Sequence, residues 1–202
     1  MYKKYVKRIL DLLTTLILMP IVVISTVIVG GLIKLEDRGK IFYNSKRLGQ
    51  YKKVFNMYKF RSMKEKSIDY RNEDGSTYNS KNDPRVTKIG GFIRKTSIDE
   101  LPQLFNVLKG DMSIVGPRPD TVEALKIYNE NEIKKLDVRP GITGYNQAYF
   151  RNSIIQSQKF ENDVYYVNNL TFIMDIKIIF KTIKSIVSSE NINNKEDVSY
   201  DQ

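Results

Sequence analysis

The sequence contains no cysteine and no histidine in its 202 residues. Without cysteine there is neither a disulfide framework nor thiolate chemistry. Without histidine the chain lacks the commonest general base and the commonest zinc ligand. Any catalysis must therefore use carboxylates, lysine, arginine, tyrosine or hydroxyl groups. A bound metal is expected to be a hard ion held by oxygen, with Mg²⁺ as the default.

Acidic residues are also few relative to basic ones. The chain has 33 Lys and Arg against 23 Asp and Glu, which gives a formal net charge of +10. Such a charge favours anionic partners, namely nucleic acid, nucleotides or phospholipid headgroups. The length allows one domain, or one domain with an appendage, and is enough to bury a sizeable core.

Charge is absent altogether from Leu12 to Ile33. As a helix this run would be about 33 Å long, enough to cross the hydrocarbon core of a membrane. Basic residues stand on both sides of it, so the positive-inside rule favours neither orientation. Pro20 lies near the middle and is expected to kink the helix. The residues alone leave two alternatives open, a re-entrant helix that returns to the same face and a kinked helix that spans the membrane.

The remaining pattern predicts a helix-rich α+β domain with a small β-hairpin. The hairpin is expected from Lys40 to Lys59, with its turn at Leu48-Gly49-Gln50. A long polar loop follows at 64–82, and residues 188–202 form a polar tail that is expected to be disordered. Helices are expected at 89–95 with a break at Gly90-Gly91, at 122–136, at 160–168 and at 172–187, and a rigid turn is expected at 139–144.

The last of these helices is strongly amphipathic. Lys177, Lys181 and Lys184 form one stripe, and a second stripe is apolar. The helix either packs its apolar side on the core with solvated lysines, or lies in the membrane interface with its lysines toward the headgroups. The apolar stripe consists of Phe172, Ile176, Ile179, Phe180, Ile183 and Val187.

The candidate chemistry lies between Ser97 and Pro119. Proline is tolerated only in the first turn of a helix, so Pro102 requires the helix to begin near Asp99. Asp99 and Glu100 then stand at the positive end of the helix, which favours an ionised Asp99. The pair can be a cap and nothing more. It can also be a nucleophile that attacks phosphorus beside a ligand for Mg²⁺.

Several cations stand beside turns or Gly and Pro breaks rather than on regular helix faces. Arg118 lies between Pro117 and Pro119, and proline restricts the backbone of its neighbour. Arginines pinned in this way suit bidentate recognition of phosphate, although each one alone is compatible with an ordinary surface position. The candidate residues for binding phosphate or nucleotide are Lys59, Arg61, Arg94, Arg118 and Arg139.

In their order and continuity these motifs resemble the small monotopic phosphoglycosyl transferases, the bacterial sugar transferase family. The resemblance covers nearly the whole chain, and no single short motif carries it. The matching motifs are Lys7-Arg8-x-x-Asp11, Arg47-x-Gly49, Lys59-Phe60-Arg61-Ser62-Met63, Asp83-Pro84-Arg85, Arg94, Ser97-x-Asp99-Glu100-Leu101-Pro102-Gln103-Leu104, Asn106-Val107-Leu108-x-Gly110-Asp111-Met112-Ser113, Val115-Gly116-Pro117-Arg118-Pro119, Arg139-Pro140-Gly141-Ile142-Thr143-Gly144, Asp163-Val164-Tyr165-Tyr166 and Asp175.

The resemblance implies a compact monotopic membrane domain with amphipathic interfacial helices. Residues 1–36 would form a re-entrant membrane helix broken at Pro20, and residues 37–187 a catalytic domain at the cytoplasmic face of the bacterial cell membrane. The family often has serine before this proline, whereas here the residue is Met19, so re-entrance rests on Pro20.

The reaction implied by the resemblance moves a sugar-1-phosphate from a UDP-sugar to polyprenol phosphate, typically undecaprenyl phosphate, and releases UMP. It is the first membrane step of bacterial glycoconjugate synthesis. By that match Asp99 is the nucleophile that forms a covalent phosphosugar-aspartate, and Glu100 is the Mg²⁺ ligand. Lys59, Arg94 and Arg118 match positions near bound phosphate.

Arg61 and Arg139 are added to the phosphate-binding set on the residues alone. The partners that the resemblance implies are a UDP-sugar, polyprenol phosphate and the lipid bilayer, with downstream glycosyltransferases as candidates and no nucleic acid. The alternative hypothesis is a non-enzymatic, membrane-anchored basic module that binds anionic lipid or nucleic acid. That alternative gives no reason for a carboxylate pair beside pinned arginines.

Overall fold

The computed structural model describes residues 1–68, 80, 83–150 and 153–187. The predicted disordered tail and most of the predicted loop at 64–82 lie outside the described residues. The predicted helix-rich α+β class with a small antiparallel hairpin is confirmed. In chain order the elements are a π-helical turn η1 (Tyr2–Val6), α1 (Lys7–Asp37), β1 (Phe42–Leu48), 3₁₀ helix η2 (Gln50–Lys52), β2 (Val54–Phe60), α2 (Lys88–Lys95), η3 (Ile98–Glu100), α3 (Gln103–Lys109), β3 (Ser113–Val115), η4 (Val122–Lys126), η5 (Glu132–Asp137), β4 (Gly141–Thr143), α4 (Tyr145–Tyr149), α5 (Gln156–Asn168) and α6 (Phe172–Val187).

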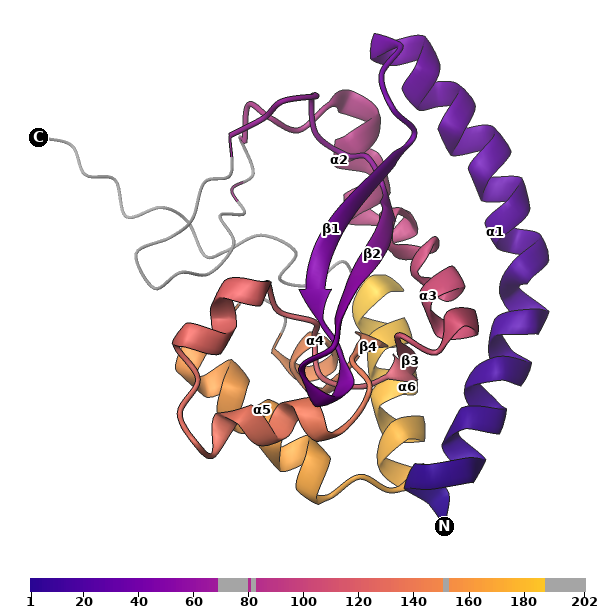
Figure 1. The fold of residues 1–202 in the computed structure, drawn as a ribbon. Helices are drawn as coiled ribbons and strands as arrows, with labels where there is room; N and C mark the ends of the chain where they lie inside the picture. Colours follow the sequence, from indigo (N-terminus) through magenta and orange to yellow (C-terminus); the bar gives the residue numbers. More distant parts are fainter. Residues whose placement is uncertain (69–79, 81–82, 151–152, 188–202) are drawn as a thin grey trace, which may run out of the picture.

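The apolar segment forms α1, one continuous helix that contains Pro20. Figure 1 shows it as a curved helix along one side of the domain, beside α2 and α3. Thr15, Val22 and Ile33 are buried on the side that faces the domain, whereas Pro20 is exposed. By length and composition residues 2–37 are able to cross a membrane. The curvature agrees with a bend at proline, and re-entrance stays a prediction.

Polar contacts fix the N-terminal part of α1 to the domain. Asp11 is buried, and its carboxylate accepts hydrogen bonds from Ser113 Oγ at 2.8 Å and from the Ile114 backbone N–H at 3.0 Å. Arg8 donates to two backbone carbonyls in the last turn of α3, at 2.6 and 3.1 Å. The last four carbonyls of a helix lack i+4 partners, and of these two only that of Val107 also accepts from the C-cap Gly110 N–H, so Arg8 helps to cap α3 at its C-terminal end.

Strands β1 and β2 form the predicted hairpin, in register from Phe42 opposite Phe60 to Leu48 opposite Val54. The side chain of Asn106, in α3, closes the free edge of β2. Its Oδ1 accepts a hydrogen bond from the Tyr58 N–H at 3.0 Å, and its Nδ2 donates to the Asn56 carbonyl at 2.8 Å. An amide side chain thus takes the place of a third strand and joins α3 to β2.

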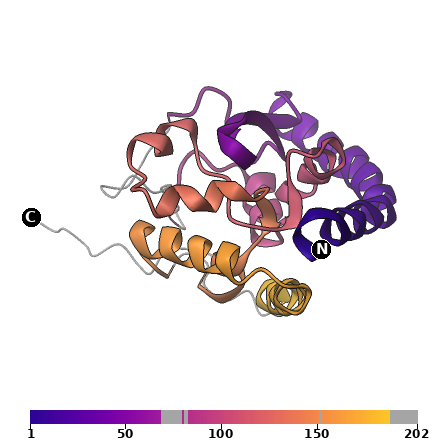
Figure 2. The same ribbon diagram turned by 60° about the horizontal axis from the view of Figure 1, so that its bottom comes forward.

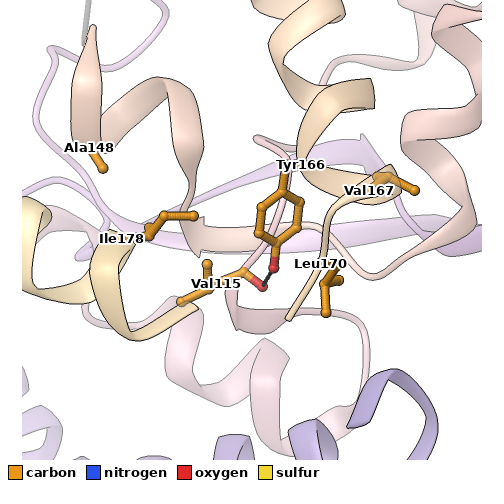
Figure 3. Close-up of a cluster of buried hydrophobic side chains, with 6 residues drawn as sticks. All are labelled: Val115, Ala148, Tyr166, Val167, Leu170 and Ile178. Atoms are coloured by element: carbon orange, nitrogen blue, oxygen red, sulfur yellow. Dashed lines mark hydrogen bonds between the residues drawn. The ribbon is translucent and has the colours of Figure 1, made fainter. Parts of the chain in front are cut away.

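The core on the other side of the molecule gathers around α6. Figure 3 shows Tyr166 of α5 pointing into this cluster, with its hydroxyl beside the carbonyl of Val115. The same hydroxyl lies 2.7 Å from Asp175 of α6. The Asp175 carboxylate also accepts hydrogen bonds from the Tyr2 hydroxyl and from Lys7 Nζ, at the start of the chain. Figure 2 shows the N-terminus beside α6. The buried cluster comprises Val115, Ala148, Tyr166, Val167, Leu170 and Ile178.

Helix α6 presents most of its predicted apolar stripe to the outside rather than to the core. Phe180 is 70% exposed and Ile183 is 54% exposed, whereas the buried side of the helix carries Asp175, Ile178 and Ser185. The alternative in which the stripe packs on the domain core is therefore wrong. An exposed face of this kind is typical of a surface that meets a membrane or another protein.

Three local predictions need correction, the first at 122–136. The predicted single helix is two short 3₁₀ helices, η4 and η5. Asn129 Oδ1 accepts from the Glu132 N–H, and Glu132 Oε2 accepts from the Asn129 N–H, both at 2.9 Å. This reciprocal pair closes a turn immediately before η5 and so interrupts the predicted helix in its middle.

The other two corrections concern glycine-containing segments. Helix α2 runs through Gly90 without a break. A Cβ at Gly90 would lie 1.9 Å from the carbonyl oxygen of Ser62, so this glycine serves close packing rather than a turn. The predicted rigid turn after Arg139 contains β4, which pairs in parallel with β3. Its partner strand ends more than twenty residues earlier, which local pattern reasoning does not detect.

Candidate active site

The carboxylate pair lies where the chain turns from α2 into α3. Asp99 and Glu100 belong to the 3₁₀ helix η3, and Pro102 is the N-cap residue of α3. Ser97 opens the turn with a positive φ of 58°, a backbone conformation that is uncommon outside glycine. The predicted place of the pair at the start of the helix is thus confirmed to within one turn. Beneath it lies an apolar cluster of Val29, Ile33, Phe60 and Ile93, with Ile98 and Leu101 packed against it.

Three of the predicted cations come together around this pair. Lys59, from β2, places Nζ 2.7 Å from Glu100 Oε1, and Arg118 places Nη1 3.8 Å from the same oxygen. Arg94, in the last turn of α2, acts on Asp99 through its charge. Residues that are far apart in sequence therefore form one positively charged site around two carboxylates.

The two carboxyl groups differ in their protonation chemistry. Burial raises the pKa of Asp99 to about 6, although Lys59 partly offsets this rise. Burial would raise the pKa of Glu100 as well, but Lys59 and Arg118 lower it by more, and the pKa lies below its usual value. Asp99 therefore remains mostly ionised at neutral pH, as expected, although burial brings its pKa closer to neutrality than the usual value for aspartate. Pairs of carboxyls held at different pKa values are typical of catalytic sites.

The carboxylate of Asp99 differs from that of Glu100 in its hydrogen bonding. Within the part of the chain that the structure describes, no side chain or backbone N–H donates a hydrogen bond to it, although it is only 8% exposed. Glu100, in contrast, accepts a hydrogen bond of 2.7 Å from Lys59 Nζ. A held carboxylate beside a free one fits a supporting group next to a nucleophile, which capping alone does not explain.

Arg61 and Arg139 have other contacts. Arg61 forms a bidentate pair with Asp37 at the end of α1 and also donates to the Lys40 carbonyl at 2.6 Å. Arg139 donates to the Gly110 carbonyl at 2.9 Å, at the C-terminal end of α3. These contacts do not involve the carboxylate pair, and a role for either arginine in substrate binding stays a prediction.

Two supporting residues were missed in the sequence. Gln103 and Asn106 are polar but almost completely buried on α3, at 2% and 0% exposure. They stand three residues apart on a helix whose other inward residues are apolar, and that spacing was an available signal for a functional face. The amide of Gln103 helps to lower the pKa of Glu100, and Asn106 bonds β2, the strand that carries Lys59. Asn106 thereby joins the helix that follows the carboxylate pair to the strand of its lysine.

The fold and the site define a class of protein. It is a small α+β domain with a long apolar N-terminal helix and a buried carboxylate pair among converging cations, an arrangement suited to chemistry on phosphate groups. The chain belongs to the bacterial sugar transferase family, whose model matches residues 2–189.

Similar proteins come from several bacteria. The chain is 39% identical to the uncharacterized sugar transferase EpsL of Bacillus subtilis, over 96% of this chain and 93% of that protein. It is 39% identical to the undecaprenyl-phosphate galactose phosphotransferase of Salmonella typhimurium, over 91% of this chain but only 41% of that protein. It is 38% identical to the exopolysaccharide production protein ExoY of Rhizobium meliloti, over 80% of this chain and 76% of that protein.

Proposed function

We propose that this protein is a phosphoglycosyl transferase that moves a sugar-1-phosphate from a UDP-sugar to polyprenol phosphate and releases UMP. The observation that carries the proposal is the unbonded, buried carboxylate of Asp99 beside Glu100, Lys59 and Arg118. The names of relatives support the acceptor, since similar proteins are an undecaprenyl-phosphate galactose phosphotransferase and an undecaprenyl-phosphate glucose phosphotransferase.

In the first step the Asp99 carboxylate attacks the phosphorus that bears the sugar. A bond forms from Asp99 Oδ to that phosphorus, and the bond from phosphorus to the bridging oxygen breaks, so that UMP leaves with the electron pair. Lys59, Arg94 and Arg118 offset the negative charge that gathers on the phosphate oxygens. The product on the protein is an acyl phosphate that holds the sugar.

In the second step an oxygen of polyprenol phosphate attacks the same phosphorus. The bond to Asp99 breaks, the carboxylate is regenerated, and the sugar leaves as a polyprenol diphosphate. Two displacements at one phosphorus need only one nucleophilic side chain. They also need no histidine, which agrees with the composition.

The donor set of the site fits Mg²⁺. This ion is usually bound through one or two carboxylates together with substrate phosphates and water, and Asp99 and Glu100 supply adjacent hard oxygens. Glu100 would be the residue that holds it. When bound, the ion would neutralise charge on the diphosphate. No larger cluster of acidic residues is present among the described residues, so the substrate itself would complete the coordination.

We further propose that the protein works at the cytoplasmic face of the bacterial cell membrane. The exposed apolar residues of α1 and the exposed apolar stripe of α6 supply two surfaces for the bilayer. Lys177, Lys181 and Lys184 are exposed on α6 and would meet anionic headgroups. Such a placement brings the polyprenol phosphate, whose chain stays in the bilayer, to the site.

The first test is UMP release from a panel of UDP-sugars. We expect the purified protein, with Mg²⁺ and undecaprenyl phosphate in detergent or nanodiscs, to release UMP from at least one of them. Release should depend on the acceptor for multiple turnovers, because one covalent loading of Asp99 releases only one UMP per protein. A panel that gives no UMP, together with strong and salt-sensitive binding of nucleic acid, would favour a binding module instead.

The pH dependence of UMP release is expected to follow Asp99. A carboxyl must be ionised to attack phosphorus, and the pKa of Asp99 is raised to about 6 by burial. The rate under subsaturating donor should therefore fall as pH drops below about 6, to about one tenth of its plateau at pH 5. The measurement is kcat/KM from pH 4.5 to 8. A flat profile down to pH 5 would contradict the role given to Asp99.

A further inference from the structure

Arg118 reaches the site on a short segment tied at both ends. This segment, residues 116–120, is here named the Arg118 loop. At its start Gly116 and Pro117 make two backbone hydrogen bonds with β4, each 2.9 Å long. At its end the Asp120 carbonyl accepts a hydrogen bond of 2.9 Å from the N–H of Leu48, the last residue of β1. The loop therefore spans the two small sheets.

A buried side-chain network adds a further tie at the end of the loop. Asp120 Oδ2 accepts from Lys135 Nζ at 2.5 Å and from the Tyr128 hydroxyl at 2.6 Å. Lys135 is only 2% exposed, and its ammonium lies 5.1 Å from the centre of the Phe160 ring. A lysine this buried is costly unless it is fully paired. Here it is paired, because Asp163 Oδ2 lies 2.5 Å from the same nitrogen.

Arg118 depends on this backbone support because its own contact is weak. Its side chain is 54% exposed and its distance to Glu100 is 3.8 Å. An exposed ion pair of that length contributes little, while ordering a long side chain costs conformational entropy. The direction of Arg118 is therefore set mainly by the loop, through its two prolines and its tied ends.

We propose that Lys135 is a positioning residue, which acts through Asp120 to hold the Arg118 loop and so to keep Arg118 at the carboxylate pair. The role rests on the proposed function, in which Arg118 binds substrate phosphate. Neither Lys135 nor Asp120 touches the reacting atoms. Their contribution is to fix a cation that would otherwise sample many directions, which is how preorganised sites gain affinity.

The network offers a matched pair of variants. Lys135 binds two carboxylates, but only Asp120 belongs to the Arg118 loop. Asp163 belongs to α5, and its second oxygen accepts a hydrogen bond of 2.8 Å from Asn146. Asp120→Asn and Asp163→Asn each remove one of the two negative charges that pair with Lys135. The first removes the charge on the Arg118 loop, and the second removes the charge on α5.

The experiment is a double-mutant cycle on the Kd for UDP, measured by calorimetry with the full chain in detergent. We expect Asp120→Asn to raise the Kd about tenfold, and to have no further effect in the Arg118→Ala background. Asp163→Asn should leave the Kd within about twofold while lowering the urea midpoint by a similar amount to Asp120→Asn. Should Asp120→Asn fail to fold, Tyr128→Phe removes one hydrogen bond from Asp120 and should raise the Kd in the same coupled way.

The outcomes separate this inference from the proposed function. Equal Kd changes in Asp120→Asn and Asp163→Asn, or an Asp120→Asn effect that persists without Arg118, would show a merely structural network and overturn the inference. A wild type that does not bind UDP would overturn it as well. A wild type that binds UDP but releases no UMP from any UDP-sugar contradicts the proposed function, while the Kd cycle still decides whether Asp120, the loop residue paired with Lys135, positions Arg118.

Discussion

Replacement of Asp99 by asparagine is expected to abolish UMP release, with a loss of about 10⁴-fold or more, because the amide cannot form the acyl phosphate. The intermediate should disappear with it. Intact-protein mass spectrometry of the wild type, incubated with a UDP-sugar but without acceptor, should show an added sugar phosphate, and the variant should show none. Asp137→Asn, an exposed position on η5, makes the same chemical change away from the site and should keep full activity.

The same variant is expected to be more stable than the wild type. Burial raises the pKa of Asp99 from 3.8 to about 6, so the folded state binds the proton more tightly than the unfolded state. This group's contribution to stability is greatest below pH 4 and is lost as pH rises through 6. At pH 7 the loss is about 3 kcal/mol, and asparagine, which is neutral, should recover most of it. Urea unfolding of both proteins at pH 7 measures this; a variant that is less stable than the wild type would contradict the account.

Asn106→Asp is expected to destabilise the fold by about 3 kcal/mol or more at pH 7, although the two side chains have nearly the same shape. Asn106 is fully buried and donates through Nδ2 to the Asn56 carbonyl at 2.8 Å and to Asp111 at 3.2 Å. A carboxylate has no donor for these acceptors and would face a second carboxylate. The measurement is the free energy of unfolding in urea, followed by tyrosine fluorescence and circular dichroism.

The charge of the new carboxylate makes the Asn106→Asp effect dependent on pH. Burial and the nearby Asp111 would raise the pKa of the introduced acid, so the penalty should grow with rising pH and shrink toward pH 5. Asn44→Asp is the control, because Asn44 lies opposite Tyr58 in the hairpin but is exposed. It should change stability by less than about 0.5 kcal/mol. Equal midpoints for Asn106→Asp and the wild type would refute the edge-closing role of the amide.

Sequence reasoning succeeded where one local rule decides the structure. The hairpin follows from β-favouring residues on both sides of Gly49, although Leu48, predicted in the turn, ends β1, and the connection continues through η2. Pro102 sets the start of α3, and Gly110 ends that helix with a positive φ of 88°. These two residues alone place Asp99 and Glu100 at the entrance of a helix. The clustering of Lys59, Arg94 and Arg118 around the pair was predicted from pinned cations and from the family resemblance together.

The rest depended on contacts between distant segments. Helical periodicity identified α6 but not which of its faces is buried, since that depends on Asp175, whose partners Tyr2 and Lys7 lie at the other end of the chain. The raised pKa of Asp99 is likewise a consequence of burial, and no spacing in the sequence measures burial. The pairing of Arg61 with Asp37 is a further contact of this kind. The position of Arg61 beside Lys59 in the sequence suggested phosphate binding and gave no sign of this ion pair.

Arg8 and Asp11 change how the apolar helix should be regarded. A helix that only anchored the domain in a membrane could be removed without effect on the domain. Helix α1, however, donates hydrogen bonds to the last carbonyls of α3 and accepts one from the start of β3. The apolar composition of the chain ends near residue 36, but the hydrogen bonds of Arg8 and Asp11 join the segment before this point to the domain after it. Shortening the chain to gain solubility would therefore uncap the very helix whose other end presents Asp99 and Glu100.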